Sequence, residues 1–348
     1  MDERLREKLL ELGAAEEEIE EAAREGRVTV LVLERLLLPH REVFTASEVV
    51  AQAGIPKEIS DRLWRAMGFP DTGEDERAYT EFDVAALEQM AALFELPGRD
   101  INLGVQLTRV VSLALSRVAE AWWDTVEALS EEFVTEDAGD EDLAGVVLDQ
   151  LRLEETMHLV EYVLRRQMVS TVRRRLEMGL GEEQTLLTVG FCDLVGWTSM
   201  SQQVDPKELS SLVTEFEAIC FDRIAELGAR LVKTIGDEVM FVADEPATAA
   251  DVSLSIVTSL REHPRLPDVR GGLACGPVTQ LEGDYFGPVV NLASRLVSVA
   301  RRGTVVVSEE VHQALEDLDR YGWSRLPPRR VKDVGLVRPW AIRVRSDG

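Results

Sequence analysis

The sequence predicts two domains of different class, an all-α first half and an α+β second half. Up to about residue 175 the apolar residues recur at helical spacing, and glycines or prolines stand where the helices should end. From Thr185 onward, apolar runs of strand length alternate with amphipathic helices. A length of 348 residues and a hydrophobic content of 45% are sufficient for about two folded domains.

Acidic charge is concentrated in the first half. About -23 of the formal net charge of -26 falls before residue 165. Such a surface repels phosphate backbones, so we do not expect a nucleic acid partner. The longest nearly apolar run, residues 28–38, is too short to cross a bilayer, and the amino terminus lacks a signal-peptide pattern. We therefore expect a cytoplasmic protein without a membrane span.

Helices of two lengths are expected in the first half. Short helices should end at Gly13, at Gly26 and before Pro39. Two long helices should follow, one from Ile101 to about Glu132 and one from about Leu143 towards Arg175. The second of these turns from acidic to basic and should end at the glycines 179 and 181. We therefore divide the chain into an acidic helical domain (1–164), a helical linker (165–184) and a second domain (185–348).

The stretch from Phe44 to Pro70 reads as helix, turn, helix. Thr45 or Ser47 would cap the first helix, Gly54 would make the turn, and a further helix would begin near Thr80. This stretch resembles the helix-turn-helix that opens MerR-type regulators. It would either bind DNA or keep the geometry and contact only protein, and the acidic surroundings favour the second interpretation.

In the second half of the sequence, the patterns of a strand, a helix, two strands, a helix and a strand follow one another. This order predicts a ferredoxin-like core. Asp205 should cap the first of these helices. A shorter set of elements and a terminal hairpin, at about 329–344, would extend the core. The expected strands are 185–193, 229–235, 238–243, 269–281 (or a hairpin) and 304–308, and the expected helices are 206–227, 246–261, 288–301 and 309–318.

Two aspartates stand where strands of this core should end. Asp193 follows one apolar run and Asp237 interrupts another, and each lies beside a glycine and a tight turn. Carboxylates brought together in this way repel each other unless a divalent cation lies between them, and oxygen ligands favour magnesium or manganese. Downstream, Asn291 and Arg295 are spaced to lie one helical turn apart on one face of a helix.

Three segments together, TVGFCDLVGWT, RLVKTIGDEVMF and GDYFGPVVNLASR, resemble the catalytic domain of the class III nucleotidyl cyclases. The resemblance covers about residues 185–345 and implies the same ferredoxin-like fold. It implies two divalent cations per active site, Mg²⁺ or Mn²⁺, bound by Asp193 and Asp237. It further implies that Lys233 and Asp284 bind the purine and that Asn291 and Arg295 orient the ribose and stabilise the transition state.

A lysine near the carboxyl terminus completes the resemblance. Lys332, in RRVKDVG, matches the lysine that contacts the triphosphate in this family. Asp333 stands where many family members have glycine, and a carboxylate there could weaken nucleotide binding or point away.

The purine-binding pair implies adenine. A lysine at Lys233 can donate to adenine N1, and a carboxylate at Asp284 can accept from the exocyclic amine. Guanine presents the reverse pattern of donors and acceptors. In the family, the metal aspartates of one subunit meet the base-binding and transition-state residues of another. This chain carries both sets, so we expect a twofold homodimer with two sites.

We therefore expect an adenylate cyclase that converts ATP to 3′,5′-cyclic AMP and pyrophosphate. The alternative is a transcription regulator that senses nucleotide and binds DNA through its helix-turn-helix.

The acidic half, more weakly, resembles the regulatory domain of pH-responsive, autoinhibited actinobacterial cyclases. His158 lies on the helix that leads into the linker, and a histidine titrates near neutrality unless buried. We expect the first half to inhibit the enzyme at neutral or alkaline pH, and acid or another signal to relieve the inhibition. A small apolar ligand bound by the helices is a second candidate signal, and a passive dimerisation stalk is the alternative to regulation.

Overall fold

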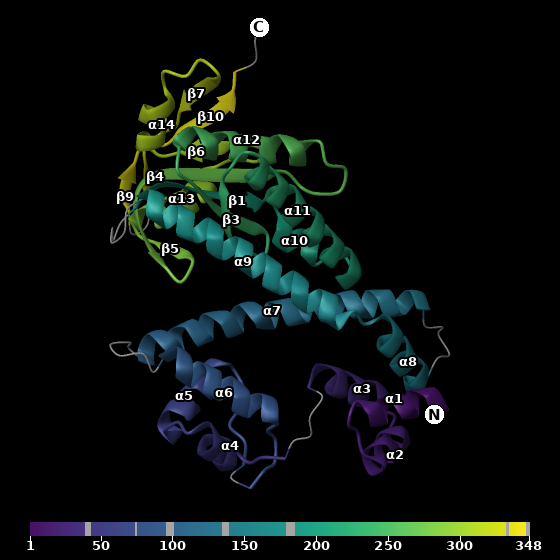
Figure 1. Ribbon diagram of the computed structural model, residues 1–348. Coiled ribbons are helices and arrows are strands. Elements are labelled where there is room, and N and C mark those ends of the chain that lie inside the picture. Colours follow the sequence, from purple (N-terminus) through teal and green to yellow (C-terminus); the bar gives the residue numbers. More distant parts are fainter. Residues whose placement is uncertain are drawn as a thin grey trace. The chain divides into compact units, whose positions relative to one another are not determined.

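The computed structural model describes residues 1–38, 43–73, 75–94, 101–133, 139–178, 185–331 and 334–345 (Figure 1). The chain divides into two compact units, Met1–Ser170 and Thr171–Gly348. Among the described residues, no helix is long and apolar enough to cross a membrane.

Four helices of the first unit pack around one apolar cluster that includes Leu9, Ile19 and Val32. Asp140 ties two of them together, because its carboxylate accepts hydrogen bonds from the backbone N–H groups of Val28 and Thr29. These N–H groups have no partner within their own helix, so Asp140 caps it. The helices are α1 (Glu3–Glu11), α2 (Glu16–Glu25), α3 (Val28–Leu37) and α8 (Asp140–Gln150).

A second group of helices includes the expected helix, turn and helix. The Thr45 hydroxyl accepts from the backbone N–H of Glu48, and Gly54 ends the first helix in the left-handed region at φ 67°. The group packs around Val49, Leu63 and Leu87. Its members are α4 (Ala46–Ala53), α5 (Lys57–Ala66), α6 (Glu81–Phe94) and α7 (Ile101–Phe133).

The predicted continuous helix from Leu143 to Arg175 is wrong. Two helices occupy this stretch, α8 and α9 (Leu153–Met178), and Leu151 between them is extended, with ψ 105°. The Leu151 side chain packs against the apolar cluster around Leu9, and this contact favours the break over a straight helix. No glycine or proline marks the break, so the helical periodicity continues through it. The two glycines expected to end α9, at 179 and 181, lie outside the described residues.

The second unit has the predicted ferredoxin-like core. Its four core strands lie in the order β2-β3-β1-β4, and all neighbouring pairs are antiparallel. The Asp205 carboxylate caps the first connecting helix by accepting from the Glu208 N–H at 2.9 Å, as expected. The core elements are β1 (Thr185–Leu194), α11 (Pro206–Glu226), β2 (Arg230–Ile235), β3 (Glu238–Ala243), α12 (Pro246–Arg261) and β4 (Val269–Leu281).

Further strands extend this sheet beyond β4, and the predicted terminal hairpin over 329–344 is wrong in part. β10 inserts between β6 and β7 of the main sheet, whereas β8 and β9 form a separate two-stranded sheet. The extension comprises β5 (Asp284–Phe286), α13 (Pro288–Val299), β6 (Val305–Val307), α14 (Glu309–Leu315), β7 (Tyr321–Arg325), β8 (Arg329–Val331), β9 (Gly335–Val337) and β10 (Trp340–Val344).

Both faces of the sheet are covered, and β1 is an interior strand between β3 and β4. Helices α11 and α12 bury one face around Phe216 and Ile256, and α13 buries the other around Leu296 (Figure 1). Gly190 in β1 lies directly against the Phe241 ring, where a Cβ atom would overlap it. This close packing holds β1 against β3 three residues before Asp193.

Candidate active site

Asp193 lies near the carboxyl end of the central strand β1. Its neighbours across the sheet are Glu238 in β3 and Arg270 in β4. The carboxylate Oδ2 accepts two hydrogen bonds from Arg270, from Nε at 2.8 Å and from Nη2 at 2.6 Å. The Asp193 side chain is 15% exposed, so this charge is partly withdrawn from water and paired.

Asp237 lies in the tight turn between β2 and β3. Gly236 supplies the left-handed residue of the turn at φ 62°, and the carbonyl oxygen of Asp237 accepts from the Leu194 N–H at 3.1 Å. Burial raises the pKa of the Asp237 carboxyl, and the neighbouring Asp193 carboxylate raises it further. The structure therefore brings the two predicted metal aspartates together.

Two residues beside these aspartates were not found from the sequence. Burial raises the pKa of Glu238 to about 7, and the charges of Asp193 and Asp237 contribute to the same shift. Arg270 opposes it and holds Asp193. Both residues are placed by the strand register opposite Asp193, and a single sequence does not reveal that register.

The aspartate pair has the chemistry of a site for a hard divalent cation. Carboxylate oxygens are the ligands that Mg²⁺ and Mn²⁺ prefer, and Asp193 and Asp237 bring two carboxylates to one place. No group of three or more His, Cys, Asp or Glu side chains within the described ranges is arranged to hold a metal.

The predicted purine-binding pair is joined in the structure. The Lys233 ammonium, on β2, donates to Oδ2 of Asp284 at the start of β5. The other carboxylate oxygen, Oδ1, accepts from the backbone N–H of Tyr285 at 2.8 Å. Both side chains keep about a third of their surface exposed, 36% for Lys233 and 29% for Asp284. The ammonium has three donors and each carboxylate oxygen has two lone pairs, so both can bind a further polar group.

Asn291 and Arg295 lie one turn apart on α13, as the spacing predicts, and both are exposed. Their side chains make no hydrogen bond or ion pair to any residue in the described part of the chain. Lys332 and Asp333 lie outside the described residues.

Comparison with known proteins identifies the family. Residues 181–335 match the model of the adenylate and guanylate cyclase catalytic domain, and residues 2–144 match that of the adenylate cyclase regulatory domain. An adenylate cyclase of Streptomyces coelicolor is 35% identical over 91% of this chain and 90% of its own length. The chain belongs to the class III adenylate cyclases. A second adenylate cyclase, of Streptomyces griseus, is 36% identical over 90% of this chain and 88% of its own.

A further relative bears on the regulatory half. A pH-sensitive adenylate cyclase of Mycobacterium tuberculosis is 30% identical over 86% of this chain and 78% of its own length. The resemblance predicted from the catalytic motifs is thus confirmed, and so is the weaker one of the helical first half to an adenylate cyclase regulatory domain.

Proposed function

We propose that this cyclase converts ATP to 3′,5′-cyclic AMP and pyrophosphate at sites shared between two copies of the chain. The proposal is based on one observation: Asp193, near the end of β1, and Asp237, in the turn between β2 and β3, lie next to each other. Their strands belong to the core matched by the cyclase catalytic domain, which supports a catalytic role for the pair.

The two aspartates would hold two divalent cations, Mg²⁺ or Mn²⁺. Bound there, the cations would supply activation of the ribose 3′-hydroxyl and neutralisation of the triphosphate. Arg270 keeps Asp193 oriented through its two hydrogen bonds. A guanidinium also suits phosphate oxygens, so we assign Arg270 to the triphosphate as well.

Lys233 and Asp284 would select adenine. Their ion pair holds the two side chains in one place before the base arrives, which lowers the entropy lost on binding. The unused ammonium donors fit adenine N1, and the unused carboxylate lone pairs fit the exocyclic amine. Guanine would place like groups against like at both positions.

Asn291 and Arg295 would act on substrate held by the other subunit. Their exposure on α13, without partners in the described part of their own chain, leaves both free to contact ribose and phosphate. Lys332 would bind the triphosphate. Because the chain carries both halves of the site, a twofold homodimer would close two equal sites.

The first half would regulate this activity. The match to an adenylate cyclase regulatory domain and the likeness to a pH-sensitive relative support that role, with acid as the proposed signal. We keep the proposed bounds of a regulatory domain at 1–164, a linker at 165–184 and a catalytic domain at 185–348, in a cytoplasmic protein that does not bind nucleic acid. Apolar side chains exposed along α9, among them Leu159, Leu164, Met168 and Leu176, suit contact with a second copy.

Product analysis tests the catalytic assignment. Purified protein with ATP and Mn²⁺ should yield cyclic AMP, and Asp193→Ala or Asp237→Ala should abolish the product while the melting temperature stays near that of the unchanged chain. Asp244→Ala, at another strand end, is the control and should keep activity, because Asp244 is 59% exposed and its ion-pair partner among the described residues is Arg230. Cyclic AMP formation by either of the first two variants would contradict the metal assignment.

A further inference from the structure

A cavity of about 190 Å³ lies within the helix, turn and helix module, between α4, α5 and the segment that leads into α6. Val49 and Leu87 give it an apolar floor. Trp64 forms a wall, with its ring centroid 4.9 Å from that of Tyr79. A cavity of about 150 Å³ can accept benzene, so this one has room for a small side chain together with polar groups.

One polar group of the cavity wall faces the cavity itself. Ser60 is only 5% exposed, and its hydroxyl makes no hydrogen bond to any residue that the structure describes. The hydroxyl oxygen is not sealed from solvent, so water can be its partner while the cavity is empty. A polar atom of a bound molecule would take the place of that water.

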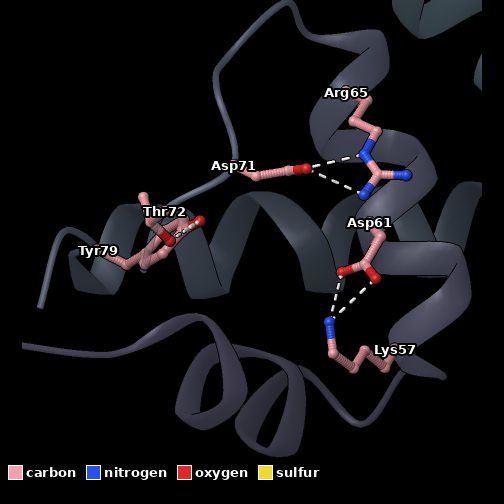
Figure 2. Close-up of polar contacts among 6 residues, drawn as sticks. All are labelled: Lys57, Asp61, Arg65, Asp71, Thr72 and Tyr79. Carbon is pink, nitrogen blue, oxygen red and sulfur yellow. Dashed lines mark hydrogen bonds and ion pairs between the residues drawn. The ribbon is translucent and has the colours of Figure 1, made fainter. Parts of the chain in front are cut away.

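The rim of the cavity carries two ion pairs (Figure 2). Lys57 donates to both carboxylate oxygens of Asp61 at 3.0 Å. Arg65 donates to both oxygens of Asp71, at 3.2 and 3.0 Å, from the helix to the loop that follows it. Lys57 and Arg65 are 70% and 63% exposed, so either cation can leave its carboxylate partner and be hydrated at little cost in free energy.

The helix α5 arranges these groups in two adjacent rows. Asp61 and Arg65 lie one helical turn apart in the rim row, and Ser60 and Trp64 lie one turn apart in the row beside it. An ammonium group at Asp61 and a carboxylate at Arg65 can therefore belong to the same small molecule. Its apolar part would then lie against Trp64, and Ser60 would bind one of its polar atoms.

We propose that this cavity binds a small zwitterion with an apolar side chain, that is, a free α-amino acid of the size of leucine or phenylalanine. A ligand with both charges can pair with Asp61 and Arg65 at the same time, and the displaced Lys57 and Asp71, which are 70% and 64% exposed, are then hydrated. A ligand with one charge can pair with only one of them. The proposal concerns binding alone and does not depend on the catalytic assignment.

The charges of the helix, turn and helix module disfavour a nucleic acid as its partner. Residues 43–94 contain ten aspartates and glutamates against four lysines and arginines. Lys57 and Arg65, which a recognition helix would direct to phosphates, are paired with carboxylates of the same module.

Calorimetric titration of the full-length protein tests the proposal. L-leucine and L-phenylalanine are the probes, and isoamylamine and isocaproate are leucine analogues that lack the carboxylate or the amine. We expect saturable binding of at least one amino acid to one site per chain, with both analogues at least about tenfold weaker. Equal binding of either analogue, or no saturable binding of either amino acid up to about 10 mM, would overturn the proposal.

Variants locate the site. Ser60→Ala and Arg65→Gln should each weaken amino acid binding by about tenfold, because each removes one polar contact. Glu58→Gln lies on the same helix but does not line the cavity, so its affinity should not change. Arg65 is mostly exposed, so Arg65→Gln should fold normally, which circular dichroism and the melting temperature check. Unchanged affinity in both cavity variants, or an equal loss in Glu58→Gln, would place binding elsewhere.

Discussion

Removing the Lys233–Asp284 pair tests how the enzyme selects its base. In the structure the pair is about a third exposed, so it contributes at most about 1 kcal/mol to folding stability. Lys233→Met and Asp284→Ala should therefore change the melting temperature very little. Each variant, however, leaves a polar edge of a bound adenine without its partner.

The expected loss follows from that unpaired edge. A missing hydrogen-bond partner in a closed site costs about 1 to 3 kcal/mol, so each variant should lower kcat/KM for ATP by about 5- to 150-fold. The two side chains contact each other, so the double variant should lose less than the product of the two single losses. Lys233→Glu with Asp284→Cys should weaken ATP use in the same way, because it removes both adenine contacts.

Initial rates of cyclic AMP and cyclic GMP formation, measured with ATP and GTP over a range of concentrations, give the comparison. Lys8→Met is the control, since Lys8 also forms an ion pair, with Glu11, far along the sequence from the catalytic domain. If the ratio of kcat/KM for ATP to that for GTP is the same in all variants as in the unchanged enzyme, Lys233 and Asp284 do not select the base.

Three further predictions concern pH, packing and control. Without metal, the protonated Glu238 carboxyl favours the folded state because its pKa is raised to about 7, and this contribution to stability is lost as pH rises through about 7. Glu238→Gln should therefore flatten the fall in melting temperature between about pH 5 and 8. An unchanged dependence of melting temperature on pH would be inconsistent with the raised pKa of Glu238. Gly190→Ala should lower the melting temperature by several degrees, since a Cβ there overlaps the Phe241 ring, and an unchanged melting curve would show that the ring can move. A chain beginning at residue 185 that still melts cooperatively should be more active at neutral pH than the full-length enzyme, and identical pH profiles would refute inhibition by the first half.

Local signals in the sequence were sufficient for most of the catalytic fold. The Asp205 cap, the strand pattern of β1 and the glycine turn before Asp237 depend on neighbouring residues, so they can be read from a short segment. The paired aspartates were predicted for the same reason, since each lies beside its own turn.

Features set by distant contacts could not be predicted. The break at Leu151 depends on an apolar cluster formed by helices from the beginning of the chain. The insertion of β10 between β6 and β7 and the placement of Arg270 opposite Asp193 depend on strand pairing between separate segments. The short strands concerned have few residues to show a period, so their partners are not evident from the sequence alone.

Complementation between two inactive chains is the most direct test of sites shared between subunits. Asp193→Ala and Arg295→Ala should each be inactive alone. When they are mixed in equal amounts, half of the dimers should contain one chain of each kind, and each such dimer should have one intact site. Recovery of about a quarter of the activity of the unchanged enzyme is therefore expected. No recovery, with mixed dimers demonstrated by co-purification through two different tags, would contradict the sharing of sites between subunits.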